Sequence, residues 1–236
     1  MSRPGFRVMT YNLRAFRDDW RAAAHAVRVV EPDVLCLQEV SRTWFPTRRT
    51  RAFAAAAGLD WPANRARGGG TTVLVRPGLA VTGWSHHRLR VPFVQGLREG
   101  VRGYAVVRLD LDLAGRRLPI SVVSVHLGLR PQERFGQVER LSPGVPLGDP
   151  AVIAGDINED DAGEAWRLLA QAGRTRLVSS VRATFPAAAP SICLDAVFAS
   201  PPLVRAQVTE QPILPEDLLA RASDHRPVWV DLTVAD

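Results

Sequence analysis

Polar side chains of the kinds that carry out phosphate chemistry lie at the ends of successive apolar segments in this sequence. They are Asn12, Gln38, Glu39, His126, Asp156, Asn158, Asp195, Asp224 and His225. A single Asn or Asp in such a place usually forms a turn or a cap, so no member of the set is informative alone. Together they provide hard oxygen ligands for a divalent cation, acid–base groups and donors for a phosphate. The set therefore predicts metal-assisted chemistry on a phosphate ester.

The expected cation is Mg²⁺, with Mn²⁺ as the alternative. Mg²⁺ retains waters and takes phosphate oxygens, so one or two carboxylates such as Glu39 and an amide oxygen suffice as protein ligands. Zinc fits less well because no Cys or His cluster has the spacing of a structural zinc site. His86 and His87 are neighbours in a loop-like stretch and lack the i, i+4 spacing that places two imidazoles on one helical face.

The segments that carry these side chains alternate between strand and helix patterns. Strands are expected at residues 6–12, 34–38, 72–75, 104–113, 119–127, 151–154, 194–199 and 228–232. Helices are expected at 20–30, which Asp18 and Asp19 open, at 46–57, which Gly58 ends, and at 161–171. Strands 104–113 and 119–127 should pair as a hairpin around Gly115. Hairpins and crossover helices together predict mixed sheets in a layered α/β protein.

The composition is that of an ordinary globular chain, with 236 residues, 46% of them hydrophobic and 23% charged. Without an internal repeat or a linker-like tract, the simplest expectation is one domain over residues 1–236. No apolar run approaches the roughly 20 residues that span a bilayer, and the N-terminus does not resemble a signal peptide. A cytoplasmic protein without stable membrane association is therefore expected. Cys36 and Cys193 lie in apolar runs and are expected to be buried thiols.

The positive charge of the chain comes entirely from arginine. The formal net charge is +6, and no lysine occurs in the sequence. Arginine can bind a phosphate through two hydrogen bonds, which would suit a phosphorylated partner. The coding bias of a GC-rich genome explains the same composition, so charge alone does not identify a partner.

Six short blocks carry the candidate residues in a characteristic order. They are Thr10-Tyr11-Asn12, Pro32-Asp33-Val34-Leu35-Cys36-Leu37-Gln38-Glu39-Val40, Ser124-Val125-His126-Leu127, Gly155-Asp156-Ile157-Asn158, Leu194-Asp195-Ala196-Val197-Phe198 and Ser223-Asp224-His225-Arg226-Pro227-Val228. In content and order they resemble the endonuclease/exonuclease/phosphatase family, also called the deoxyribonuclease I-like superfamily. The resemblance implies an α/β fold, a four-layer sandwich in which two mixed β-sheets pack face to face with helices on the outside. It also implies metal-dependent hydrolysis of phosphoester bonds at one end of the sandwich.

The same resemblance assigns roles to the candidate residues. Glu39 is expected to be the principal metal ligand, with Asn12 and Asp224 assisting through the ion or its waters. His225 is expected to be the general base that activates water, and Asp195 to hold its imidazole in the useful tautomer.

Four further residues are expected to contact the substrate or the attacking water. Asp156 and Asn158 would position the water and a phosphate oxygen, and His126 would donate to a non-bridging or leaving-group oxygen. Arg102 lies where many relatives carry an arginine before a strand, which places it near the phosphate.

Two departures from the family pattern narrow the expected subfamily. Relatives that cut DNA at abasic sites usually carry a tyrosine where this chain has His126, so that repair role is less expected. The secreted nuclease type pairs its second histidine with a glutamate in a preceding strand, where this chain reads Gly68-Gly69-Gly70-Thr71-Thr72. Whether His126 transfers a proton or only orients the phosphate stays open.

The leading hypothesis is a Mg²⁺- or Mn²⁺-dependent phosphodiesterase, a nuclease, that acts as a monomer on nucleic acid. Its specificity region would be the loop-like stretch 85–102, although a solvated surface would look the same. The arginines that would follow a nucleic-acid backbone are Arg65, Arg67, Arg88, Arg90, Arg98 and Arg102.

Two alternatives to a nuclease remain. One is a phosphatase or phosphodiesterase for a small or lipid-linked phosphate, such as a phosphoinositide or sphingomyelin headgroup, for which Trp44-Phe45 and Val91-Pro92-Phe93 would form a small apolar rim. The other is a catalytically silent binding module, against which the presence of Glu39, Asp195, Asp224 and His225 counts.

Overall fold

The computed structural model describes residues 5–40, 46–64, 70–89, 102–113, 115–141, 150–172, 174–208 and 210–235. Its strands are β1 (Phe6–Asn12), β2 (Val34–Gln38), β3 (Thr72–Val75), β4 (Ala80–Leu89), β5 (Arg102–Leu113), β6 (Arg116–His126), β7 (Ala151–Asp156), β8 (Arg176–Leu177), β9 (Asp195–Ala199), β10 (Leu203–Arg205) and β11 (Val228–Val234). Its helices are α1 (Trp20–Val30), α2 (Pro46–Ala57), α3 (Pro131–Leu141), α4 (Glu164–Ala172) and α5 (Glu216–Ala222), with a 3₁₀ turn, η1, at Arg14–Phe16.

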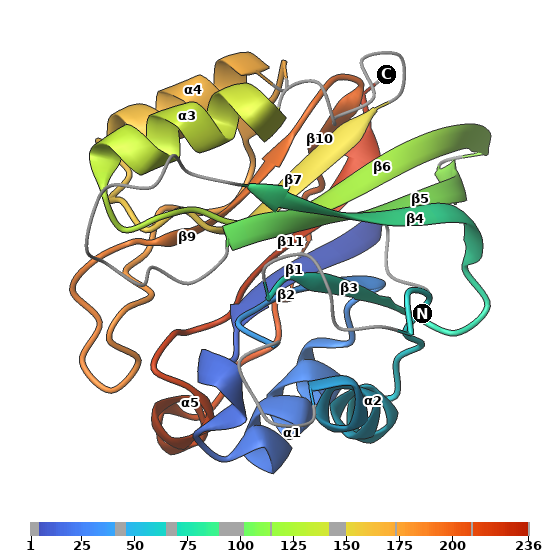
Figure 1. The fold of residues 1–236 in the computed structure, drawn as a ribbon. Helices are drawn as coiled ribbons and strands as arrows, with labels where there is room; N and C mark the ends of the chain where they lie inside the picture. Colours follow the sequence, from blue (N-terminus) through green and yellow to red (C-terminus); the bar gives the residue numbers. More distant parts are fainter. Residues whose placement is uncertain are drawn as a thin grey trace.

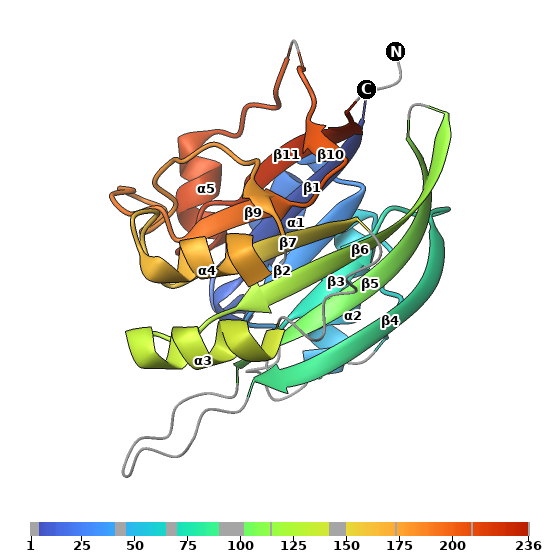
Figure 2. The same cartoon turned by 90° about the horizontal axis from the view of Figure 1, so that it is seen from above.

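The strands form two mixed sheets packed face to face (Figure 1). One sheet has five strands in the order β10-β11-β1-β2-β3, and the other has six in the order β4-β5-β6-β7-β9-β8. Within each sheet one pair is parallel, β1 with β2 and β6 with β7, and the other neighbours are antiparallel. Helices α1, α2 and α5 lie below the five-stranded sheet, and α3 and α4 cover the outer face of the other (Figures 1 and 2). The predicted four-layer α/β sandwich is confirmed.

Three apolar layers hold the sandwich together. Between the sheets, inward-facing side chains such as Val8, Val107 and Val197 are buried. A second layer packs the five-stranded sheet against α1, α2 and α5, and a third packs the six-stranded sheet against α3 and α4. Strands β1, β2 and β7 are buried along their whole length, as expected for strands covered on both faces.

In the N-terminal β1–α1–β2 unit, local signals in the sequence predict where the helix begins and ends. The Asp19 side chain accepts hydrogen bonds from the backbone N–H groups of Arg21 and Ala22, which caps the start of α1. The helix ends at Glu31, which adopts a left-handed conformation before Pro32. The expected strands at 6–12 and 34–38 and the helix at 20–30 are confirmed.

Other expected elements differ from the structure mainly at their ends. The hairpin is confirmed, but its strands extend over Arg102–Leu113 and Arg116–His126. Strand β7 reaches Asp156, β9 begins at Asp195, β11 continues to Val234, and α4 begins at Glu164. Helix α2 and strand β3 have the expected bounds. Helices α3 and α5 and strands β4, β8 and β10 were not predicted.

The expected loop at 85–102 is wrong for its first part. Ser85, His86, His87 and Arg88 lie in β4, which pairs with β5 as the edge strand of the six-stranded sheet. The sequence obscured this strand because Gly83 interrupts it at a bulge. Residues 90–101, with Arg90, Arg98 and Val91-Pro92-Phe93, lie outside the described part of the chain, as do Trp44-Phe45, Arg65 and Arg67.

Both cysteines are free thiols and buried, as predicted. Within the described ranges, every helix is too short or too polar to cross a bilayer.

Candidate active site

The candidate residues come together because their strands end at the same side of the sandwich. In the five-stranded sheet, Asn12 is paired with Gln38 at the ends of parallel β1 and β2, and Glu39 follows directly. In the other sheet, His126 is paired with Asp156 at the ends of β6 and β7, and Asp156 is paired with Asp195 at the start of β9. The parallel pairs β1–β2 and β6–β7 and the antiparallel pair β7–β9 each bring these side chains to one end of their own sheet.

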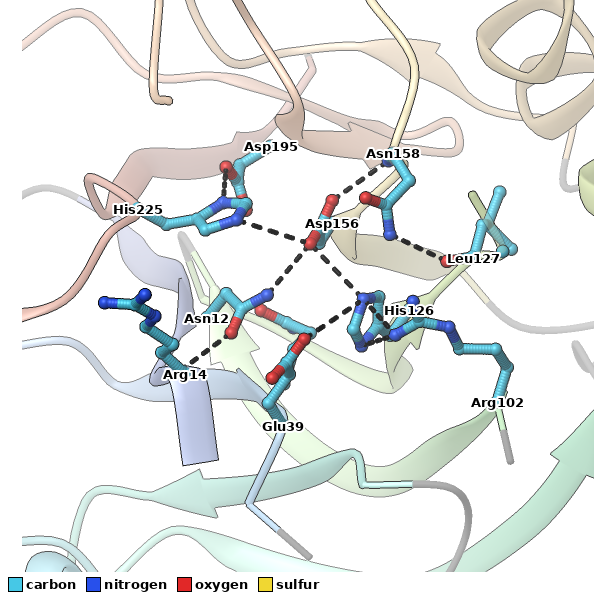
Figure 3. A network of polar contacts seen from close by, with 12 residues as sticks. Asn12, Arg14, Glu39, Arg102, His126, Leu127, Asp156, Asn158, Asp195 and His225 are labelled. Atoms are coloured by element: carbon cyan, nitrogen blue, oxygen red, sulfur yellow. Dashed lines mark hydrogen bonds and ion pairs between the residues drawn. The ribbon is translucent and has the colours of Figure 1, made fainter. Parts of the chain in front are cut away.

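Asp156 lies at the centre of this group (Figure 3). Its Oδ2 atom accepts a hydrogen bond from Asn12 Nδ2 at 2.9 Å, which connects the two sheets. The same oxygen lies 3.4 Å from His126 Nε2 and 3.8 Å from His225 Nε2. Its Oδ1 atom accepts a hydrogen bond from the backbone N–H of Asn158 at 2.9 Å.

His225 forms a buried pair with Asp195. The imidazole Nδ1 lies 2.9 Å from Asp195 Oδ2, and both side chains are less than a tenth exposed. Thr184 Oγ1 donates to the same carboxylate oxygen at 2.7 Å, and the ring of Phe185 lies 5.0 Å from the imidazole ring. The pair fixes the orientation of His225 and leaves Nε2 directed toward Asp156 (Figure 3).

Asn158 has two contacts that hold it beside this group. It adopts a left-handed conformation with φ of 55°, which asparagine tolerates better than most residues. Its Nδ2 donates to the carbonyl of Leu127 at 2.8 Å, so the loops after β6 and β7 are joined through this side chain.

Glu39 and Asp224 face the more open side of the site. Glu39 has a φ of 60°, its side chain is 20% exposed, and Oε1 lies 4.0 Å from His126 Nε2. Asp224 Oδ2 lies 3.1 Å from Arg14 Nε, and its side chain is 29% exposed. Both carboxylates are therefore accessible to a bound ion or its waters.

Burial and mutual repulsion shift the pKa values of the carboxylates upward. Burial raises the pKa of Asp156 to about 6, and Asp195 adds to this effect, while His225 and the donors Asn12 and Asn158 oppose it. Burial also raises the pKa of Asp224; His225 and Arg14 oppose this effect, and Asp18 and Glu39 add to it. A site that concentrates negative charge in this way favours a cation.

The pKa of His225 responds to the same charges. Burial alone would lower it, but the charge and hydrogen bond of Asp195, with Asp156 and Asp224, raise it to about 10. The imidazolium is therefore the stable form at neutral pH as long as the surrounding carboxylates are not neutralised. To act as a base, His225 needs positive charge beside these carboxylates.

The residues present fit a divalent cation. Asp195 Oδ1 is buried and has no hydrogen-bond partner within the part of the chain that the structure describes. Ligand atoms of Asp156, Asp195 and His225 lie within 4.8 Å of one another, and Glu39 and Asp224 add two carboxylates with access to solvent. Oxygen-rich donor sets of this kind suit Mg²⁺ or Mn²⁺.

Arg102, the first residue of β5, lies against His126. Its Nη1 is 2.8 Å from His126 Nδ1. The same Nη1 atom is also in contact with His126 Nε2, so the guanidinium lies against both ring nitrogens of the imidazole. The nine residues with an expected role in the site all lie at this end of the sandwich, and those roles stay predictions. They are Asn12, Glu39, Arg102, His126, Asp156, Asn158, Asp195, Asp224 and His225.

Arg14 is a site residue that the sequence analysis missed. Arg14, Ala15 and Phe16 have φ values of 43°, 57° and 55°, which is a run of left-handed residues directly after β1. The Arg14 N–H donates to Asn12 Oδ1 at 3.0 Å, and its guanidinium contacts Asp18 and Asp224. Strained backbone of this kind concentrates at functional sites. In the sequence, Arg14 could have been found only from its position two residues after the candidate ligand Asn12.

Arg134 of α3 was also missed. Its side chain is 7% exposed and donates to the carbonyls of Gly128 at 3.3 Å, Leu129 at 2.7 Å and Asn158 at 3.1 Å. A second Nη atom donates to Glu159 Oε1 at 2.7 Å. Arg134 therefore holds together the loops that follow His126 and Asp156. Neither this contact nor that of Thr184 has a local sequence signal, because both depend on tertiary packing.

Comparison with known proteins identifies a family and a relative that cover most of the chain. The model of the endonuclease/exonuclease/phosphatase family matches residues 9–225. The protein YbhP of Escherichia coli (strain K12) is 28% identical over 229 residues, which cover 88% of this chain and 85% of YbhP.

Solved structures share the fold at low sequence identity. An endonuclease/exonuclease/phosphatase from Bacteroides vulgatus superposes with a TM-score of 0.74 at 19% identity, covering 98% of this chain and 99% of its own. A mannosyl-6-phosphatase from Bacteroides thetaiotaomicron superposes with a TM-score of 0.69 at 18% identity, covering 97% of this chain and 99% of its own.

Proposed function

The chain belongs to the endonuclease/exonuclease/phosphatase family, and from this membership we propose that it is a divalent-metal-dependent phosphodiesterase that cleaves nucleic acid. The observation that carries the proposal is the buried Asp195–His225 pair, whose free imidazole nitrogen faces Asp156 next to two accessible carboxylates. An oriented imidazole beside a metal-binding set is what hydrolysis of a phosphoester requires.

Glu39, Asp224 and the Asn12 side-chain oxygen are the groups that would hold Mg²⁺ or Mn²⁺. When bound, the cation supplies positive charge that polarises a phosphate oxygen and offsets the surrounding carboxylates. The hydrogen bond from the Arg14 N–H to Asn12 Oδ1 helps to keep this amide oriented.

The chain's own residues then divide the work of hydrolysis. His225 Nε2 takes the proton of a water molecule whose oxygen attacks phosphorus, and the ester P–O bond breaks on the opposite side. Asp195 stabilises the imidazolium that forms. Asn158 and Asp156 position the water and a phosphate oxygen, and His126 with Arg102 contacts the phosphate oxygens or the leaving group.

Cleavage of supercoiled plasmid tests this proposal. Wild-type protein is incubated with Mg²⁺, Mn²⁺ or EDTA beside the His225→Ala variant. Nicking that requires metal and is lost in the variant supports a nuclease. Intact plasmid, from folded protein that still binds metal, excludes it in favour of another phosphoester.

A phosphatase or phosphodiesterase for a small or lipid-linked phosphate is the second candidate. It is favoured by the likeness of the fold to a mannosyl-6-phosphatase. Salt separates the two, because a protein that contacts several backbone phosphates loses affinity steeply with added salt, whereas one that binds a single phosphate group does not. A panel of phosphomonoesters, phosphoinositide and sphingomyelin headgroups is the matching substrate test.

A further inference from the structure

A pocket of about 380 Å³ lies next to the candidate active site, along β11. Strand β10 pairs with β11 only from Leu232 to Val234, so the preceding residues of β11 border the pocket instead. Its volume is within the range of small-molecule sites. Thr184 forms part of its wall, and the hydroxyl of this residue donates to Asp195 at 2.7 Å. The pocket is thus one residue away from the Asp195–His225 pair.

The charge in the pocket is positive once existing ion pairs are considered. Both carboxylates in its lining are already engaged, because Glu216 pairs with Arg226 and the buried Asp231 pairs with Arg7 at 2.8 Å. The remaining lining arginines, Arg182 and Arg205, have no carboxylate partner among the residues that the structure describes. Arg205 donates only to Ser180 Oγ, at 2.9 Å. Two exposed guanidiniums in one pocket favour an anion, and the planar fork of each can bind a phosphate through two hydrogen bonds.

Another part of the lining is apolar and contains an aromatic ring. Trp229 is held by a hydrogen bond from its Nε1 to Gln211 Oε1 at 2.8 Å, and Gln211 in turn donates to Asp231 at 3.1 Å. Ile213 is 88% exposed, an unusual position for a large aliphatic side chain, and Val228 completes this wall. A ring fixed in this way offers apolar contact area at little entropic cost.

We propose that this pocket binds a phosphate monoester with a flat or apolar organic group, of the size of a nucleoside monophosphate. Arg182 and Arg205 bind the phosphate through charge-assisted hydrogen bonds, and Trp229 and Ile213 contact the organic group. The site does not depend on the proposed nuclease activity, since none of these four side chains belongs to the candidate active site.

Calorimetric titration of the full chain with adenosine monophosphate tests the proposal. EDTA is present, so that metal-assisted phosphate binding at the candidate active site is suppressed. The Arg182→Gln/Arg205→Gln variant should weaken binding by about tenfold for each arginine. The matched control, Arg116→Gln/Arg117→Gln, removes the same charge from exposed positions at the start of β6 and should bind like wild type. Trp229→Phe should retain binding, and Trp229→Ala should weaken it.

Two further measurements locate the ligand and separate its parts. Arg102→Gln should bind like wild type, and a loss of binding in this variant would place the ligand in the candidate active site and overturn the proposal. Adenosine and inorganic phosphate should each bind more weakly than adenosine monophosphate. Absence of binding, equal weakening by the control variant, or equal affinity for inorganic phosphate would also overturn it. Plasmid cleavage reports on the proposed function separately, so either proposal can fail alone.

Discussion

The imidazole Nδ1 of His225 lies 2.9 Å from Asp195 Oδ2, although the two residues are 30 positions apart in the sequence. Asp195 begins β9 in the six-stranded sheet, and His225 precedes β11 in the five-stranded sheet. The pair therefore forms only when the two sheets have packed face to face. A change that disturbs the packing of the two sheets should therefore also disturb the Asp195–His225 pair.

Replacing His225 with Ala should remove the proton acceptor. We expect turnover to fall by roughly 10²- to 10⁴-fold, the usual contribution of general base catalysis. The circular dichroism spectrum and the metal affinity should stay close to wild type, because the expected ligand Glu39 is intact. An unaltered turnover number would exclude His225 as the base.

Replacing Asp195 with Asn should reduce turnover while preserving the shape of the site. The amide cannot stabilise an imidazolium, and it can hold the ring in the wrong tautomer. Because Asp195 is the main group that raises the pKa of His225, this variant should also lower that pKa from about 10, which NMR titration of the imidazole measures. Thr184→Val removes only the hydroxyl that donates to Asp195 and should have a smaller effect. Wild-type turnover in Asp195→Asn would contradict the assigned role.

Replacing Glu39 with Gln should raise the Mg²⁺ or Mn²⁺ concentration needed for half-maximal activity. The substitution keeps size and removes the charge that a hard cation prefers. Asp112→Asn is the matched control, since Asp112 is an exposed carboxylate of β5 remote from the site. Metal titrations of wild type and Glu39→Gln that overlay would show that Glu39 is not a ligand.

Replacing Arg134 with Ala should release the loops that carry Asn158 and follow His126. Small displacements of positioning groups can reduce turnover by up to about 100-fold. Lysine at this position cannot reproduce the planar arrangement that serves three carbonyls and Glu159, so Arg134→Lys should recover only part of the activity. A variant with reduced thermal stability but unchanged turnover at low temperature would show that Arg134 supports the fold alone.

The sequence was informative where one local rule decided the structure. Strand β2 is an almost continuous apolar run and β1 a short, mostly apolar one, and their parallel pairing brings Asn12 and Glu39 to one end. Helix α3 was missed because charged residues and Gly136 weaken its helical pattern. The contacts of Arg14 and Thr184 were missed because they depend on a strained turn and on packing between distant segments. Local periodicity carries no information about either.

Gly155 offers a test of the close packing that aligns Asp156. A Cβ atom at this position would lie 2.0 Å from the carbonyl oxygen of Val125, its register partner on β6. Gly155→Ala therefore requires the two strands to separate, and we expect a loss of about 3 kcal/mol or more in the free energy of unfolding, measured by urea denaturation.

Gly136→Ala is the same substitution at another glycine, and we expect it to stabilise the fold where Gly155→Ala destabilises it. Gly136 lies inside α3, and a Cβ atom there would meet no atom within 4 Å. Since alanine favours a helix over glycine, this variant should gain roughly 0.5 to 1 kcal/mol. The two variants should also differ in activity, because separation of β6 and β7 displaces His126 from Asp156, whereas α3 is unaffected. Equal stability of the two variants would mean that the β6–β7 contact at Gly155 does not constrain the site.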